Sequence, residues 1–165
     1  MNLPSQPLDD AHALKCELAA ESLRSSGTLR LQVTGWSMLP SVWPGDTLMV
    51  ERVTSSAVAE GDIVLFGRDR RLVAHRVVAK DSVPGDGILT RGDAMPAPDS
   101  PVSDRELLGR VSHIVRNGKC IEPSRSLCIS ERAVAALVRS SDIAARLVVG
   151  VHGMRQASLG LASSV

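Results

Sequence analysis

Hydrophobic and polar positions alternate through most of the middle of the chain. In residues 28–34, Leu29, Leu31 and Val33 alternate with polar neighbours, and this period of two predicts a half-buried strand. Further apolar runs, separated by Gly-Asp and Pro-Gly turns, predict short strands at 47–53, 63–66, 72–78 and 107–115. The pattern therefore predicts a mainly β fold.

A hairpin is predicted at the end of this region. Asn117 and Gly118 separate the apolar run 111–115 from Cys120 and Ile121. A two-residue type I′ turn needs positive φ at both central positions, which Asn-Gly accepts. The β region therefore closes near residue 123.

Helical spacing occurs at both ends of the chain. Residues 11–24 carry Ala11, Leu14 and Leu18 at helical spacing, with aspartate before them and Gly27 after them. We expect this helix to dock on the core, and the alternative is a surface helix that contacts a membrane or partner. Ser130 is expected to cap a helix through residue 138, and a second helix is predicted at 142–149. We divide the chain into a helical segment 1–27, a β domain 28–123 and a helical segment 124–165.

Composition limits the function classes. The 165 residues are 44% apolar but only 2% aromatic, so an aliphatic core of one domain is expected. Nineteen basic against 18 acidic residues, with so few aromatics, argue against nucleic acid as a partner. The three cysteines are odd in number and form no CxxC pair, so we expect no disulfide framework. We also expect no bound metal and no cofactor.

No targeting or membrane-spanning segment is expected. The first ten residues are polar and acidic rather than basic and then apolar. A membrane span needs about 18 apolar residues in a row, whereas the uncharged stretch 31–45 is interrupted by glycine and proline. We therefore expect a cytoplasmic protein, with peripheral membrane contact through the terminal helices as the alternative.

The segment 35–46 is the first candidate for chemistry. It follows a predicted strand and contains two prolines and two glycines, so a rigid turn is expected. A hydroxyl held in such a turn, with backbone N–H groups beside it, has what a nucleophile and its oxyanion site require. Ser37 is that hydroxyl, and its alternative role is a hydrogen bond within the turn.

Three motifs in order resemble the type I signal peptidases. Residues 35–46 are similar to the box of that family that runs Ser-Met-x-Pro and then Gly-Asp. Residues 61–66 and 73–78 look like its strand pair carrying the general base, and residues 89–99 resemble its Gly-Asp segment. The resemblance covers roughly residues 33–111. It implies a LexA/signal-peptidase-like coiled β-sheet fold with short helices at both ends.

The resemblance also implies the catalytic residues. Bacterial signal peptidases use lysine as the base, whereas archaeal, endoplasmic-reticulum and some sporulation forms carry histidine, and His75 occupies that position. A neutral imidazole can take the serine proton and return it to a leaving amine. A carboxylate would orient the ring; by the family pattern Asp93 is preferred and Asp99 is second. Lys80 and His113 are alternative bases.

Substrate and oxyanion contacts follow from the same resemblance. Met38 and Pro40, next to the nucleophile, are assigned to substrate binding. Gly35 stands where signal peptidases usually have a serine that helps hold the oxyanion, so the backbone N–H of Ser37 is expected to do this. Gly-x-Ser-Met is instead similar to the self-cleaving LexA-like branch.

The favoured function is a serine endopeptidase of the signal-peptidase type that cleaves a protein or peptide precursor through an acyl-enzyme. One alternative is an inactive module that binds a peptide or partner along a strand edge. Another is a self-cleaving LexA-like regulator.

Overall fold

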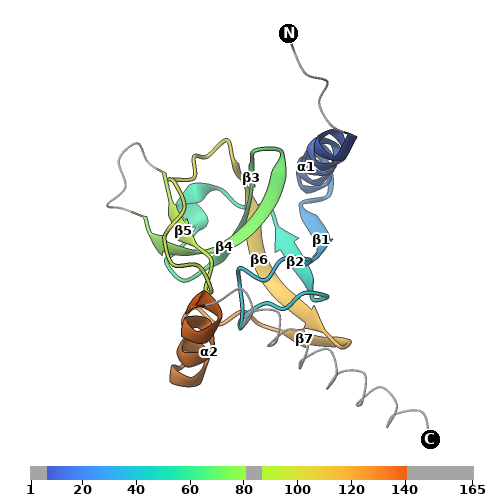
Figure 1. Cartoon of the computed structure of the whole chain (residues 1–165). Coiled ribbons are helices and arrows are strands. Elements are labelled where there is room, and N and C mark those ends of the chain that lie inside the picture. Colours follow the sequence, from blue (N-terminus) through green and yellow to red (C-terminus); the bar gives the residue numbers. More distant parts are fainter. Residues whose placement is uncertain (1–6, 81–86, 141–165) are drawn as a thin grey trace, which may run out of the picture.

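The structure, a computed structural model, describes residues 7–80 and 87–140. Strands fill the middle of the chain and a helix lies at each end of the described part (Figure 1). In chain order the elements are α1 (Pro7–Ser26), β1 (Thr28–Gln32), β2 (Thr47–Glu51), the 3₁₀ turn η1 (Ser55–Ala57), β3 (Ile63–Arg68), β4 (Arg71–Ala79), β5 (Leu89–Arg91), β6 (Leu107–Arg116), β7 (Lys119–Ile121) and α2 (Ile129–Ser140).

The strands form one antiparallel sheet in the order β1-β2-β6-β3-β4-β5, with β7 paired to β6. The β2, β3 and β4 strands each have a register shift against a neighbour, and such irregularities increase the local twist. This sheet with its two helices confirms the predicted mainly β fold.

The core consists mainly of aliphatic side chains, on both faces of the central strands. Leu65 belongs to one hydrophobic cluster, whereas its neighbours Val64 and Phe66 belong to another. Alternate residues of a strand point to opposite faces, so β3 is covered on both sides. The composition, rich in Val, Leu and Ile, had indicated such a core.

The α1 helix docks on the sheet with its C-terminal half. Ala19 and Leu23 are 5% and 2% exposed, whereas Leu14 and Leu18 are 55% and 60% exposed. Docking is therefore confirmed, but the face predicted from Leu14 and Leu18 is wrong. The helix covers the sheet with the neighbouring face that carries Ala19 and Leu23. Gly27, at φ 73°, ends the helix by donating from its N–H to the Leu23 carbonyl at 3.1 Å.

The predicted hairpin is confirmed. Arg116 pairs with Lys119 across the turn, and Asn117 and Gly118 have φ of 51° and 73°. Both values are positive, as a type I′ turn requires.

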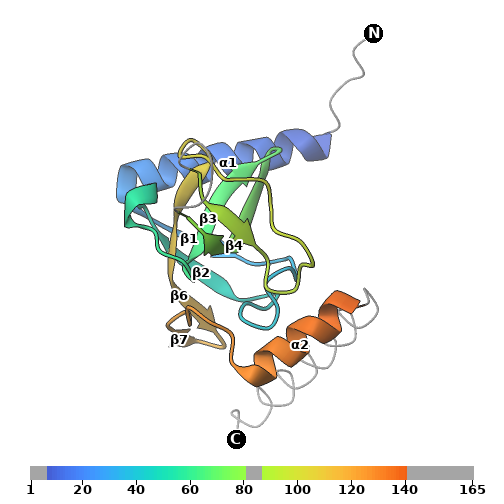
Figure 2. The ribbon, with the colours of Figure 1, turned by 90° about the vertical axis from the view of Figure 1, so that its left-hand side faces the viewer.

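The α2 helix lies at the opposite end of the sheet from α1 (Figure 2). It begins at Ile129, and the Cys128 N–H donates to the Glu131 carboxylate at 2.8 Å. Cys128 thus occupies the capping position that was predicted for Ser130. The helix predicted at 142–149 lies outside the described residues. In the described part of the chain, no helix has the length and apolar character needed to cross a membrane.

Candidate active site

The segment that carries Ser37 is a closed loop between β1 and β2. At its base the Val33 N–H donates to the Asp46 carbonyl and the Gly45 N–H donates to the Val33 carbonyl, both at 2.8 Å. The Asp46 carboxylate, 3% exposed, accepts from the Trp43 N–H at 2.8 Å and from Arg116 at 2.7 Å. A buried, fully bonded carboxylate at the base makes the loop rigid, as its prolines and glycines predicted.

Apolar side chains anchor the middle of this loop. Met38, Leu39 and Val42 are 3%, 0% and 1% exposed, and the Val42 N–H donates to the Met38 carbonyl at 2.9 Å. Met38 was predicted to bind substrate, but it packs in the core and has almost no surface to offer. Pro40, joined to Leu39 by a cis peptide bond, is half-buried.

Ser37 and His75 lie within hydrogen-bond distance. The Ser37 Oγ is 3.0 Å from the His75 Nε2, although the two residues come from different parts of the chain. His75 lies in β4, where its ring meets the edge of Phe66 with centroids 6.2 Å apart. The ring therefore points to the same face as the second hydrophobic cluster, as the alternation with Val73 and Val77 predicted.

Asp99 is the carboxylate that contacts the histidine. Its Oδ2 lies 2.7 Å from the His75 Nδ1 and accepts from the Thr90 hydroxyl at 2.7 Å. The Asp99 N–H donates to the Thr90 carbonyl at 2.8 Å, so Thr90 holds both the backbone and the side chain of Asp99. An ionised carboxylate only accepts, so Nδ1 of the ring carries the hydrogen and Nε2 is left to accept from Ser37.

Asp93 lies elsewhere, and the preference for it as the partner of His75 is corrected by this geometry. Its carboxylate accepts two hydrogen bonds from Arg76, at 2.8 and 2.9 Å, and one from the Ser41 hydroxyl at 2.5 Å. Arg76 follows His75 directly in β4, so the two side chains point to opposite faces. Asp93 is on the Arg76 face, and Asp99 is on the His75 face.

Arg76 connects four segments around the site. Besides Asp93, it donates to the Gly61 and Ser124 carbonyls at 2.8 and 2.6 Å and to the Ser41 hydroxyl at 3.0 Å. Arg76 and Asp93 are each 7% exposed. Sequence reasoning missed this clamp; the available signal was a charged residue on the buried face of a strand, next to the predicted base.

Gly92 brings the chain close to both reacting groups. A Cβ at this position would lie 2.7 Å from the Ser37 carbonyl oxygen and 3.0 Å from the His75 Nε2. The Ala94 N–H donates to the same Ser37 carbonyl at 2.9 Å. The segment after β5 therefore needs glycine here because it packs directly on the Ser37–His75 pair.

The backbone around Ser37 is open on one side. Within residues 7–80 and 87–140, the Ser37 N–H donates no hydrogen bond to the protein. Gly35 is exposed, and a Cβ there would meet no atom within 4 Å. The alternative bases lie elsewhere: the Lys80 ammonium donates to the Ser56 and Val58 carbonyls, and His113 lines a separate cavity that neither Ser37 nor His75 borders.

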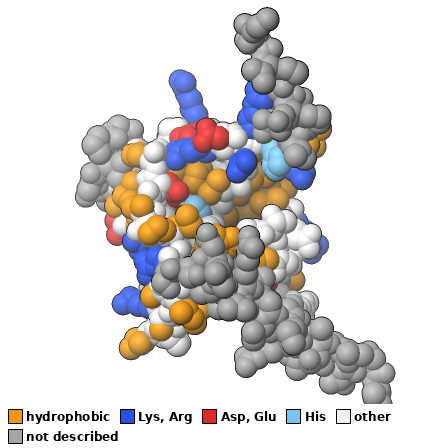
Figure 3. Space-filling view, viewed as in Figure 1, with side chains coloured by type: hydrophobic (Ala, Val, Ile, Leu, Met, Phe, Trp, Pro, Cys, Tyr) orange, Lys and Arg blue, Asp and Glu red, His pale blue; other side chains and the backbone are white. Residues whose placement is uncertain are grey.

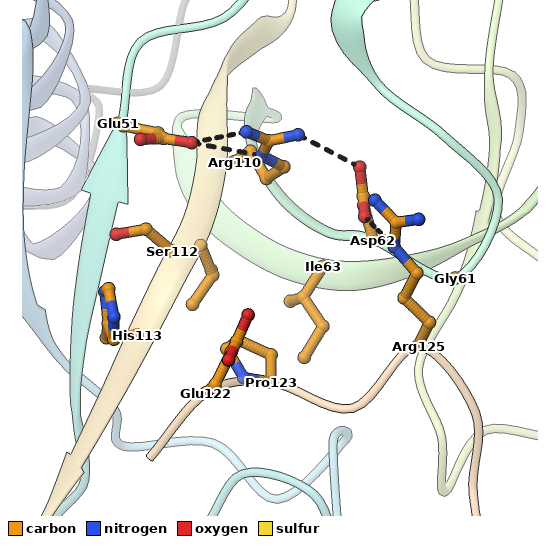
Figure 4. A pocket seen from close by; sticks show the side chains of 11 residues that line it. Glu51, Gly61, Asp62, Ile63, Arg110, Ser112, His113, Glu122, Pro123 and Arg125 are labelled. Carbon is orange, nitrogen blue, oxygen red and sulfur yellow. Dashed lines mark hydrogen bonds and ion pairs between the residues drawn. The ribbon is translucent and has the colours of Figure 1, made fainter. Parts of the chain in front are cut away.

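A chain of ion pairs borders a separate cavity of about 280 Å³, next to the start of β3 (Figure 4). Arg110 contacts Glu51 at 2.6 Å and Asp62 at 3.5 Å, and Asp62 also contacts Arg125 at 3.1 Å. The hydrogen bonds that Arg110 donates to the Glu51 carboxylate raise the pKa of Arg110 above its ordinary value. Neither Ser37 nor His75 lines this cavity, and its ion pairs hold the segment around Arg125 against the start of β3.

The arrangement is that of a serine hydrolase: a hydroxyl, an imidazole and a carboxylate joined by hydrogen bonds, with the imidazole on a strand of the antiparallel sheet and the other two groups on loops. A family model described as Peptidase S24-like matches residues 3–85, about half of the chain, including Ser37 and His75. The chain belongs to the Peptidase S24-like family, which confirms the LexA/signal-peptidase superfamily and supports a serine peptidase or LexA-like protein. No curated protein matches the chain.

Proposed function

We propose that this protein is a serine endopeptidase of the signal-peptidase type, in the histidine-bearing branch, which cleaves a protein or peptide precursor. The observation that carries the proposal is the continuous chain from Ser37 through His75 to Asp99, with distances of 3.0 and 2.7 Å. Such a chain activates an otherwise weak hydroxyl nucleophile.

The reaction has two halves. The Ser37 Oγ forms a bond to the scissile carbonyl carbon while His75 Nε2 takes the hydroxyl proton. The C–N bond then breaks, and the imidazolium returns that proton to the leaving amine. In the second half, water gives a proton to His75 and attacks the ester, and the acid product leaves as Ser37 regains its proton. Asp99 stabilises the imidazolium in both halves.

The open Ser37 N–H supports a role in holding the oxyanion. A donor that already faces the reacting carbonyl costs no reorganisation as negative charge develops. Signal peptidases usually add a serine hydroxyl two residues before the nucleophile, where this chain has Gly35. The oxyanion site proposed here therefore rests on backbone donors.

The surface between α1 and the β3–β4 hairpin suits apolar substrate residues, because hydrophobic side chains gather there in a hollow (Figure 3). Half-buried aliphatic residues from β1, its following loop and β4 pack against the first hydrophobic cluster: Leu29, Leu31, Val33, Leu72 and Ala74. The family resemblance implies cleavage after a small residue, which a shallow aliphatic surface of this kind accepts.

Cleavage of an unbiased peptide library, read by mass spectrometry, tests the proposal. Wild-type protein should cut defined bonds, and Ser37→Ala and His75→Ala should reduce cutting by at least ~10³-fold. Ser112→Ala and His113→Ala are matched controls, because they make the same chemical changes on β6, outside the Ser37–His75–Asp99 chain. Equal cutting by all five proteins would refute the proposal.

Self-cleavage is the second candidate, because membership in the S24-like family and the Gly-Trp-Ser-Met sequence both support it. Mass spectra of the incubated protein would then show a specific break that Ser37→Ala abolishes. If neither peptides nor the chain itself are cut, and partner binding survives Ser37→Ala, the protein is an inactive binding module.

A further inference from the structure

A cavity of about 400 Å³ lies on the β3–β4 hairpin, beside the histidine. We call it the leaving-side cavity. Its lining comes from the two strands, the turn between them and Asp99: Phe66, Arg68, Asp69, Arg71, Val73, His75 and Asp99. Ser37 does not line it. The cavity therefore extends from the histidine away from the nucleophile.

The mechanism determines which part of a substrate faces this cavity. The acyl part stays bonded to Ser37, whereas the leaving amine must come within hydrogen-bond reach of His75 Nε2 to receive its proton. Residues that follow the scissile bond therefore start at His75. The volume, at the lower end of the range for ligand sites, accommodates a few side chains of an extended peptide.

The floor of the cavity is apolar. Phe66 and Val73 are opposite each other in the β3–β4 register, and the next pair along the same face is Arg68 and Arg71. The Arg68 guanidinium lies 5.3 Å from the centre of the Phe66 ring. A hydrophobic side chain next to His75 would bury this floor.

The two arginines at the outer end differ in their partners. Arg68 donates to Glu106, to the Ser100 carbonyl and to the Pro101 carbonyl, each at 2.8 Å. Its donors are thus committed to the segment that follows Asp99. Arg71 is exposed and makes no hydrogen bond or ion pair within the described part of the chain.

We propose that the leaving-side cavity binds the substrate residues after the scissile bond and selects an apolar side chain followed by a carboxylate that pairs with Arg71. The inference rests on the proposed peptidase function. Arg71 is four positions before His75 in β4, which is about 13 Å in an extended strand. A substrate that lies extended along β4 has the same length per residue as the strand. Its third or fourth residue after the scissile bond therefore reaches Arg71.

The effect on selectivity is modest and measurable. An exposed arginine–carboxylate pair contributes a few-fold in affinity, about 2–5-fold, at low salt. Reversing the charge at Arg71 turns this attraction into repulsion, so the ratio of acidic to basic residues among bound peptides should change by about 10-fold.

A display selection separates this inference from the peptidase proposal. Ser37→Ala protein, which retains the cavity but cannot form the acyl-enzyme, selects from a random peptide library in three versions: with Arg71, with Arg71→Glu and with Arg30→Glu. Arg30 is exposed on β1, at the far edge of the sheet from β5, so the last version controls for overall charge. The selected peptides are then incubated with protein that retains the native Ser37, and the bond that is cut is mapped by mass spectrometry.

The inference predicts acidic residues in the Arg71 and Arg30→Glu selections and basic ones with Arg71→Glu. In cleaved peptides the acidic residue should lie three or four places after the bond. Absence of enrichment, enrichment that Arg71→Glu leaves unchanged, or an acidic residue before the bond would overturn it. If the selected peptides are acidic and bind only when Arg71 is present, but none of them is cut, the selectivity of the cavity stands and the peptidase proposal fails.

Discussion

Gly92 offers a direct test of how the site is positioned, because it touches the nucleophile segment and the histidine at once. In Gly92→Ala the new Cβ would lie 2.6 Å from Met95 Cγ, 2.7 Å from the Ser37 carbonyl oxygen and 3.0 Å from His75 Nε2. The flexible Met95 side chain can move away. The Ser37 carbonyl is backbone in a rigid loop, so it can give way only if the whole segment moves.

The size of the expected effect follows from these distances. Ordinary contact begins at 3.4 Å, so the segments carrying Gly92 and Ser37 must separate by about 0.7 Å. A misplacement near 1 Å costs about 10²-fold in rate, and we expect kcat/KM to fall by ~10–100-fold. Overpacking should cost about 1–3 kcal/mol in the free energy of unfolding. Activity should therefore suffer more than folding.

The assay measures kcat/KM on the best peptide from the library, together with the urea midpoint of unfolding. Gly67→Ala is the matched control, since a Cβ there would meet only Leu108 Cδ1 at 3.9 Å. It should leave both quantities nearly unchanged. Full activity in a folded Gly92→Ala protein would refute the argument that this close approach positions Ser37 and His75.

Three further changes separate the roles of the acidic residues. Asp93→Asn leaves the buried Arg76 without its counter-charge and should cost about 3–5 kcal/mol in urea unfolding; an unchanged midpoint would contradict the clamp. Asp99→Asn should reduce kcat by ~10³–10⁴-fold, because the ring of His75 loses its orienting acceptor, with unfolding little affected; near-normal kcat would argue against this role. The hydrogen bond from Arg68 lowers the pKa of Glu106 from 4.5 to about 2. The Glu106 carboxylate therefore stabilises the fold fully above pH 4.5, and this contribution is lost as pH falls through 2. Glu106→Gln should thus cost about 0.5–1 kcal/mol at pH 7 and progressively less as pH falls through 2, and a pH-independent difference in unfolding midpoints would exclude the ion pair as the cause.

Local patterns predicted the secondary structure well, because the signals for strands and turns extend over only a few residues. The alternation around Leu31 indicated β1, and Asn117-Gly118 indicated the hairpin because both residues accept positive φ. The predicted face of α1 was wrong because a local pattern does not show which side of a helix meets the sheet. Leu14 and Leu18 form an apolar stripe within the helix, but the sheet decides that Ala19 and Leu23 are covered.

Within the site, sequence reasoning identified the hydroxyl and the imidazole but chose the wrong carboxylate for the histidine. Asp93 and Asp99 both follow β5 and differ little in local pattern. Their partners depend on which face of β4 each one meets, and adjacent residues of β4 face opposite ways. The pairing of Asp93 with Arg76 was equally invisible, because it depends on the position of β5 beside β4.

The amino-acid sequence by itself determined the local elements: the alternating strands, the rigid turn that presents Ser37 and the strand that carries His75. These depend on backbone dihedral preferences and on the period of side-chain direction, both set by near neighbours. Only the tertiary structure decided that Asp99 contacts the ring, that Asp93 binds Arg76 and that Gly92 packs on Ser37. Those contacts join residues far apart along the chain, and their geometry exists only once the strands have paired.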